Sequence, residues 1–178
     1  EDNGFIKFDF LGLTLLKDVE NCIRRVLTRE TGSEPTFIEI RDWFDAHLNC
    51  RFVEQDDDKV WQHVYHQRRK VGIFQFTAEG ARRFCEDAKP TAIIELAALT
   101  AIYRPGPLRA NVHKKYVKDK ARADKIEYAH PIIKEILGPT FGHVTFQEQF
   151  MLLAQKLGGF TPAESDKLRK TLVKKSLD

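Results

Sequence analysis

Cysteine and long apolar runs are both scarce in this sequence. Three cysteines occur among 178 residues, widely spaced and with no C-x-x-C pair. An odd, scattered set of cysteines argues against a disulfide-stapled secreted domain, so we expect three reduced thiols and a cytoplasmic location. No apolar run approaches the roughly 18 residues that a membrane span needs, and no basic, then apolar leader is present. The sequence therefore predicts a protein without a membrane anchor.

Several motifs that carry common chemistries are also missing. The sequence has no G-x-x-x-x-G-K-[ST] loop, no G-x-G-x-x-G fingerprint and no G-x-S-x-G elbow. Their absence argues against a phosphate-binding glycine loop and against a serine hydrolase of the usual kind. Any phosphate binding is expected to depend on cationic side chains and on helix ends.

The charge of the chain is divided unevenly between its two parts. Lys and Arg number 29 against 26 Asp and Glu, a formal net charge of +3. Residues 1–58 hold 7 basic and 14 acidic side chains, whereas residues 59–178 hold 22 and 12. A strongly basic part raises the expectation of a polyanionic partner, such as nucleic acid or nucleotide phosphates. The chain opens at Glu1 and ends within a predicted helix, so we expect an excerpt of a longer protein.

The pattern of apolar residues predicts a mainly α fold with one short strand at the N-terminus. Alternation over Phe5–Phe10 places Ile6, Phe8 and Phe10 on one face of that strand. Residues 71–76 form a short apolar segment that could also be extended. Capping boxes at Thr36 and Glu39, at Thr145 and Glu148, and at Thr161 and Glu164 mark three helix starts. Helices are predicted over residues 15–31, 36–48, 54–65, 77–84, 91–103, 131–137, 145–158 and from 161 onward.

A proline-rich stop separates the most apolar predicted helix from a cationic stretch. The helix over residues 91–103 is apolar nearly all round and is expected to be buried. The segment Arg104-Pro-Gly-Pro107 should end it in a rigid elbow, because proline lacks an N–H and restricts the residue before it. Eight basic side chains follow between residues 104 and 125 on what should be an exposed surface: Arg104, Arg109, Lys114, Lys115, Lys118, Lys120, Arg122 and Lys125.

Two patterns suggest metal sites and leave alternatives open. His47-x-x-Cys50 and His63-x-x-His66 have a spacing reminiscent of a small zinc site, although histidines near helix ends usually have structural roles. Asp56 and Asp58 form a D-x-D pair that could hold a divalent metal ion. The commoner explanation is that both carboxylates are solvated and stabilise the positive end of a helix dipole.

Asp9 is a third candidate metal ligand. It lies in an otherwise apolar strand, so its carboxylate must be paired, metal-bound or exposed at a site. An edge-strand ion pair with Lys7, on the same face, is the structural alternative.

Five motifs in one order give a more specific indication. They are Lys7-Phe-Asp-Phe-Leu-Gly-Leu13, Gly72-Ile-Phe-Gln75 with Glu79-Gly80, Tyr103-Arg-Pro-Gly-Pro-Leu108, Phe146-Gln-Glu-Gln149, and Leu168-Arg-Lys170 with Lys174-Lys175. Their order resembles the C family of bacterial replicative DNA polymerases, the DNA polymerase III alpha subunits. The resemblance implies that residues 1–13 end the palm and that residues 14–178 form helical fingers, incomplete at the C-terminus.

The resemblance also implies roles for individual residues. Asp9 matches the third metal-binding aspartate of a two-Mg²⁺ site, whose other two ligands lie upstream, and Lys7 stands beside it. The implied DNA contacts are Arg109, Lys114, Lys115, Lys118, Lys120 and Arg122. The implied dNTP contacts are Lys7, Arg104, Gln147, Glu148, Gln149, Arg169, Lys170, Lys174 and Lys175.

The chain also departs from the family pattern. Phe146 replaces a tyrosine, Lys170 an arginine and Val173 a glycine, and the segment from about residue 30 to 51 is longer than the family leads us to expect. Replacing arginine by lysine at residue 170 would turn a bidentate phosphate contact into a point-charge contact.

The implied protein is a DNA-directed DNA polymerase of the bacterial cytoplasm, or of a virus within a bacterium. Its partners would be primer–template DNA, dNTPs, the rest of the polymerase chain and other replisome subunits. Two alternatives remain open: a non-catalytic basic helical module that binds nucleic acid, and a zinc-stabilised protein-interaction module.

Overall fold

The computed structural model describes residues 12–53, 57–67 and 72–174, with side chains through residue 172. The chain divides into two compact units, Glu1–Gln55 and Asp56–Asp178. The division at residue 55 falls inside the region expected to be one fingers domain. Whether residues 1–13 belong to a palm stays a prediction.

The predicted fold class, mainly α with one N-terminal strand, needs a correction. The described ranges contain helices and turns and no β-strand, so this part of the chain is all α. A strand needs a neighbouring strand to pair its backbone N–H and C=O groups, and the described residues offer none. The segment Phe5–Phe10 itself lies outside the described residues. The apolar segment before residue 77, also considered extended, forms turns over residues 72–76.

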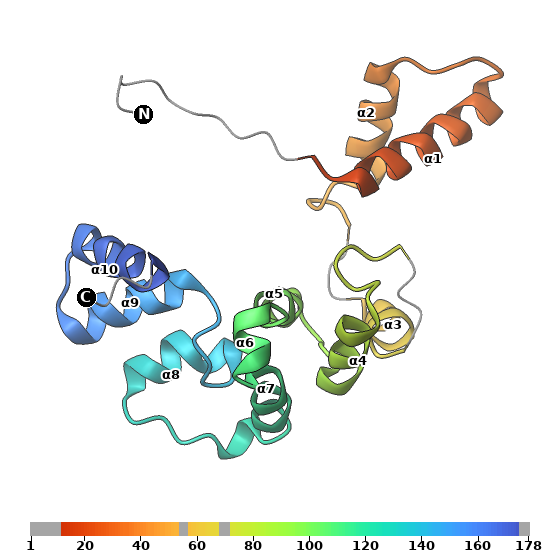
Figure 1. Cartoon of the computed structure of the whole chain (residues 1–178). Helices are drawn as coiled ribbons and strands as arrows, with labels where there is room; N and C mark the ends of the chain where they lie inside the picture. The colour runs from red at the N-terminus through yellow and green to blue at the C-terminus, as the bar shows by residue number, and fades with distance from the viewer. Residues whose placement is uncertain (1–11, 54–56, 68–71, 175–178) are drawn as a thin grey trace. The chain divides into compact units, whose positions relative to one another are not determined.

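The described part of the first unit contains two helices, α1 (Thr14–Thr31) and α2 (Phe37–His47), which contact each other (Figure 1). Gly32 ends α1 with φ 74°, a left-handed conformation that glycine adopts without steric cost. The predicted capping box starts α2: Thr36 N donates to Glu39 Oε2 at 2.6 Å, and Glu39 N donates to Thr36 Oγ1 at 3.3 Å. Ile23 and Ile40 supply the buried side chains between the helices.

The second unit begins with short helical segments. They are α3 (Asp58–Val60), the π-helical turn η1 (Trp61–Tyr65) and α4 (Glu79–Ala88). Asp57 caps α3 by accepting from Lys59 N at 2.8 Å, which confirms an acidic helix start here. Helix α4 follows the turn segment that contains Gln75, a non-glycine residue with φ 63°.

The proline segment starts a helix as well as ending one. Helix α5 (Ile93–Ile102) stops before Arg104, and α6 (Pro105–Arg109) begins at Pro105. Proline is tolerated there because the first N–H of a helix has no partner within the helix. Only the C-terminal half of α5 is buried as predicted, since Ile93 and Ile94 remain 47% and 45% exposed. Helix α7 (Val112–Lys120) and the 3₁₀ turn η2 (Ala123–Lys125) follow.

The C-terminal part consists of α8 (Pro131–Leu137), the 3₁₀ turn η3 (Gly138–Thr140), α9 (Gln147–Gly158) and α10 (Pro162–Lys174). Helices α9 and α10 lie side by side (Figure 1). The predicted box at Thr161 is present, because Thr161 N donates to Glu164 Oε2 at 2.8 Å. At the start of α9 the partner is Gln149 and not the predicted Glu148, because the helix begins at residue 147 and places Gln149 in its third position.

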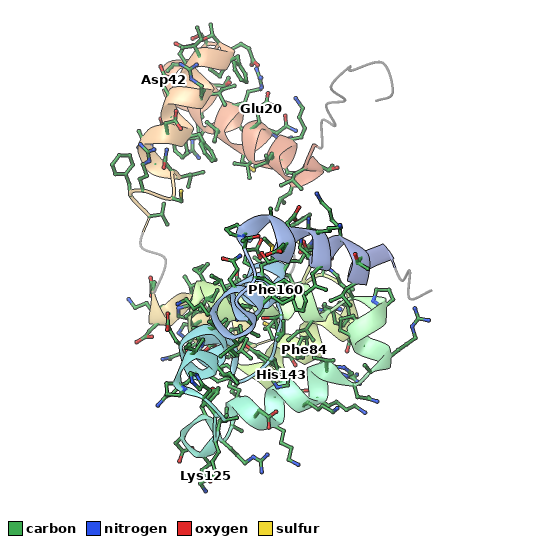
Figure 2. The ribbon with its side chains drawn as sticks, turned by 90° about the vertical axis from the view of Figure 1, so that its left-hand side faces the viewer. Glu20, Asp42, Phe84, Lys125, His143 and Phe160 are labelled. Carbon is green, nitrogen blue, oxygen red and sulfur yellow. The ribbon has the colours of Figure 1, made fainter. Side chains whose placement is uncertain are left out.

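Aromatic side chains form much of the core of the second unit. Tyr116 is fully buried and meets Phe84 and Phe141 edge-to-face, with ring centroids 6.5 and 5.4 Å apart. Figure 2 shows Phe84 among the side chains of this unit. Burial raises the pKa of the Tyr116 phenol, so this tyrosine stays neutral. Among the described helices, none combines the length and apolar character needed to cross a membrane.

Candidate functional site

Helices α9 and α10 hold an arginine between two acceptors. Arg169 Nη1 donates to Gln147 Oε1 at 2.8 Å, and Arg169 Nε and Nη2 donate to Asp166 Oδ1 at 3.0 and 2.7 Å. The Arg169 side chain retains 25% exposure. Its guanidinium is therefore oriented from both helices and still reaches solvent.

Asp166 pairs with a second cation on the same helix. Lys170 Nζ lies 2.7 Å from Asp166 Oδ2, and the Lys170 side chain is 63% exposed. Hydrogen bonds from Lys170 and Arg169 hold the pKa of the Asp166 carboxyl below its usual value. The carboxylate of Asp166 thus pairs with both cations and keeps them together.

A cavity of about 240 Å³ adjoins this cluster. Its walls are mainly apolar, with Phe146, Phe150 and Leu172 among them. The polar side chains in its lining are Thr145, Gln147 and Arg169. An apolar wall beside a cation suits a ligand that joins a ring to an anionic group. The Phe-Gln-Glu-Gln motif and the Leu-Arg-Lys motif, which are separate in sequence, meet at this point.

Gln149 of the same motif has its amide group occupied within the fold. The residue is 8% exposed, and its Nε2 donates to Ile136 O at 3.1 Å and to Thr140 Oγ1 at 2.8 Å. Its Oε1 accepts from Thr145 N at 2.9 Å and Phe146 N at 3.1 Å. These bonds tie α8, η3 and the start of α9 together, so Gln149 stabilises the place where Gln147 is presented. Glu148 is exposed to solvent.

Two further motifs meet where the start of α4 contacts the residue that follows α5. A Cβ atom placed on Gly80 would lie 2.1 Å from the Tyr103 hydroxyl oxygen, so glycine is needed for this close approach. Arg104 is exposed and lines a cavity of about 280 Å³ together with Gln75 and Thr100. Arg104 has no ion-pair partner among the residues whose structure is described.

The predicted DNA contacts differ in their surroundings. Lys114, Lys115 and Lys118 are exposed on α7 and have no ion-pair partner within the described ranges. Lys120 is only 17% exposed: its Nζ pairs with Glu95 Oε2 at 2.5 Å and donates to Lys89 O at 2.7 Å.

The two predicted arginine contacts retain exposed side chains. Arg122 pairs with Asp119 at 3.4 Å. Arg109 donates from Nε to Pro105 O at 3.2 Å. Their roles toward DNA, like that of Lys120, stay predictions.

Some predicted site residues fall outside the description. Lys7, Asp9 and Lys175 lie outside the described residues, and Lys174 closes α10 without a described side chain. Within residues 12–53, 57–67 and 72–174, no three His, Cys, Asp or Glu side chains form a group that could hold a metal ion. The proposed Mg²⁺ site therefore rests on the resemblance alone.

The zinc alternative gains no support from the described histidines. His47 Nδ1 donates to Trp43 O at 2.9 Å, and His66 Nε2 donates to Pro90 O at 2.8 Å. Both rings thus bond backbone carbonyls, and no candidate metal-binding group is found around them in the described ranges.

The order of these motifs and their meeting in space agree with the match of the sequence to a known family. Residues 19–178 match the family of the bacterial DNA polymerase III alpha subunit finger domain. The chain belongs to this finger-domain family. The match covers α1 from Val19 and every described helix after it, including the α9–α10 cluster.

Curated relatives agree with the finger-domain match. The chain is 36% identical over 181 residues to the DNA polymerase III subunit alpha of Borreliella burgdorferi, which covers 100% of this chain and 14% of that protein. The identity to the same subunit of Aquifex aeolicus is 32% over 178 residues, with the same coverage. For Rickettsia felis it is 37% over 172 residues, or 97% of this chain and 13% of that protein. The chain thus spans about one seventh of the length of these relatives.

The finger-domain helices contain one charged group that sequence reasoning missed. Asp166 precedes Arg169 and Lys170 by three and four residues, the spacing at which side chains on a helix become neighbours. This spacing could have identified Asp166 as their counter-ion. The bond from Arg169 to Gln147 crosses 22 residues and has no comparable sequence signal.

Proposed function

We propose that this chain is the part of a replicative DNA polymerase that grips the incoming dNTP and the primer–template DNA. The observation that carries the proposal is the array of Gln147, Arg169, Asp166 and Lys170 on α9 and α10. Arg169 and Lys170 already lie together on one carboxylate and are both partly exposed, and Arg169 borders a mainly apolar cavity. A triphosphate joined to a base and sugar has the matching chemistry.

The array suggests how a dNTP would bind. Triphosphate oxygens would take the place of the Asp166 carboxylate opposite Arg169 and Lys170. Exchange is cheap because exposed ion pairs on a helix are weak. Gln147 would keep the Arg169 guanidinium in position while the carboxylate is displaced. The cations then offset charge on the phosphates during nucleotidyl transfer.

Primer–template DNA would lie on the exposed lysines of α7. Lys114, Lys115 and Lys118 have no internal ion-pair partner in the described part of the chain, so their charge is available to phosphates. Contacts of this kind position DNA without reading its sequence. Arg109, Lys120 and Arg122 are further proposed DNA contacts from the same half of the chain, whereas Arg104 is proposed to contact the dNTP.

The catalytic centre is proposed from the family resemblance. Asp9 would be one ligand of a Mg²⁺ pair, with Lys7 beside it, and Lys174 and Lys175 would extend the cationic array of α10. Bound Mg²⁺ would supply activation of the primer 3′ hydroxyl. Residues 1–13 would then form the end of the palm. The proposed partners are the rest of the polymerase chain and the other replisome subunits, and the proposed location is the bacterial cytoplasm.

Steady-state primer extension by the full-length polymerase tests the proposal. Arg169→Ala should raise KM for dNTP about tenfold to hundredfold, because a charge-assisted phosphate contact is lost. The affinity for primed DNA should stay unchanged. Asp9→Asn should instead abolish turnover with DNA affinity retained.

Arg24→Ala is the matched control. Arg24 also lies between two acceptors, with Glu34 at 2.6 Å and Glu20 at 2.8 Å, and is 32% exposed. Equal dNTP kinetics in the Arg24 and Arg169 variants would contradict the assignment. If DNA binding alone depended on the basic residues, the non-catalytic basic module would be the better description.

A further inference from the structure

A third cavity lies where α7 and η2 face the turn after η3. Its volume is about 490 Å³, within the range of about 300–1,000 Å³ typical of small-molecule sites. None of the residues proposed for the dNTP lines it. Figure 2 shows one lining residue, Lys125, at the outer edge of this unit, and another, His143, further in.

The walls of this cavity combine aromatic rings with cations. Tyr128 and Phe141 are half-buried in the lining, whereas Arg122 and Lys125 are exposed. The Phe141 ring packs edge-to-face with Tyr116, with 5.4 Å between the ring centroids. Tyr128 has no aromatic partner among the described residues, so its ring is available to stack on a ligand.

The charges of the lining limit what can bind. Arg122 and Lys125 are offset by Asp119 and by the exposed Glu127. Asp119 is itself engaged by Arg122 at 3.4 Å and by His143 Nε2 at 3.0 Å. A balanced lining disfavours a free triphosphate with its several negative charges. It suits a base that carries a single phosphodiester charge.

The cavity continues the exposed lysine row of α7. Lys114 and Lys118 lie one helical turn apart, about 6 Å along the axis. Arg122 follows just beyond the end of α7 and lines the cavity. A DNA strand whose phosphates follow this row would bring its next nucleotide to Tyr128.

We propose that this cavity holds one unpaired nucleotide of single-stranded DNA, its base stacked on Tyr128 and its phosphate beside Arg122 and Lys125. The inference rests on the proposed DNA surface of α7. Stacking accepts any base, so the cavity would hold the strand without selecting its sequence.

The test uses the full-length polymerase and a primer–template whose template strand extends by about ten unpaired nucleotides, within the usual site sizes for single strands. An abasic site is moved along the overhang, and DNA affinity is measured at each position. In the unaltered protein, one position should weaken binding about fivefold to hundredfold. Tyr128→Ala should weaken binding to the intact overhang by a similar factor. In this variant, an abasic site at that position should cause no further loss of affinity. Tyr128→Phe keeps the ring and should behave like the unaltered protein.

A second variant guards against an effect of misfolding. Lys125→Ala removes an exposed cation, and it should lower affinity for the overhang but not for a blunt duplex. Lys134→Ala is the matched control, because Lys134 is exposed on α8 and does not line the cavity. Equal losses on blunt and overhanging DNA would overturn the proposal, as would an unchanged abasic profile in Tyr128→Ala.

Free nucleotide is distinguished by titration with dAMP. Suppose Tyr128→Ala loses dAMP binding while its abasic-site profile stays the same as in the unaltered protein. The ligand of the cavity would then be a free mononucleotide and not a DNA strand, which would overturn the proposal. The result for Arg169→Ala is measured as KM for dNTP on a fixed DNA substrate. If the proposal for this cavity fails, the test of the dNTP array with Arg169→Ala is therefore unaffected.

Discussion

Arg169 of α10 donates a 2.8 Å hydrogen bond to the side-chain carbonyl of Gln147, the first residue of α9. This bond joins two sequence motifs that are 22 residues apart. Since Gln147 is neutral, it orients the guanidinium without cancelling its charge. The pair therefore suits a cation that must be held in place and yet remain attractive to phosphate.

Gln147→Ala should raise KM for dNTP less than Arg169→Ala does, by about threefold to tenfold, because it removes orientation and not charge. The double variant should resemble Arg169→Ala alone, since both changes act through one guanidinium. Primer-extension kinetics of the two single variants and the double variant measure this coupling. Strictly additive effects would show that Gln147 acts on its own.

Asp166→Asn should change how folding stability depends on pH. The pKa of Asp166 is lowered in the folded protein, so its ion pairs stabilise the fold above the usual value near 3.8. That contribution is lost as the pH falls from about this value through the lower folded pKa. Urea unfolding at pH 6 should find the Asn variant less stable, and the difference should shrink below about pH 4. A difference that persists in acid would point to a cause other than charge.

Gln149→Ala should destabilise the protein by about 2–4 kcal/mol, because a buried carbonyl, a hydroxyl and backbone N–H groups lose their partner. Thermal or urea unfolding measures the loss. Glu148→Ala, which changes an exposed neighbour, is the control and should leave stability nearly unaltered. If Gln149 contacts the nucleotide as the resemblance implies, KM for dNTP in the folded variant rises as well; an unchanged KM assigns the residue to structure alone.

Gly80→Ala should destabilise the second unit by about 1–3 kcal/mol, since the new methyl group would overlap the Tyr103 hydroxyl. Tyr103→Phe in the same chain should recover part of that loss, because the next nearest ring atom lies 3.2 Å away. Gly106→Ala is the matched control, with no atom within 4 Å of the added carbon. Equal unfolding free energies for the two alanine variants would contradict the close approach.

Local sequence rules predicted the capped helix starts with one error among three boxes, but they missed helices α6 and α7 in the cationic stretch. The boxes at Thr36 and Thr161 are present because both partners lie within one helical turn. Near Thr145 the same rule chose Glu148, one residue before the true partner. Gln149 takes that place because its amide also reaches α8 and η3, contacts that no local pattern contains.

The prediction of an N-terminal strand was wrong for a related reason. Alternation over Phe5–Phe10 describes what a strand would look like, but a strand also requires a neighbour to pair with. The described residues hold no strand, so the alternating pattern alone gave a wrong fold class for the chain as the structure describes it.

By itself the sequence determined the helical character of the chain, several helix boundaries, and membership of the finger-domain family, because these depend on residues within a few positions or on ordered motifs. Only the tertiary structure decided which cations remain available. Lys120 looks like its basic neighbours in sequence, yet its side chain is mostly buried and pairs with Glu95, 25 residues away. Arg169 keeps its exposure and gains Gln147 across another helix. Such pairings depend on how helices pack, and packing brings together residues that no sequence spacing relates.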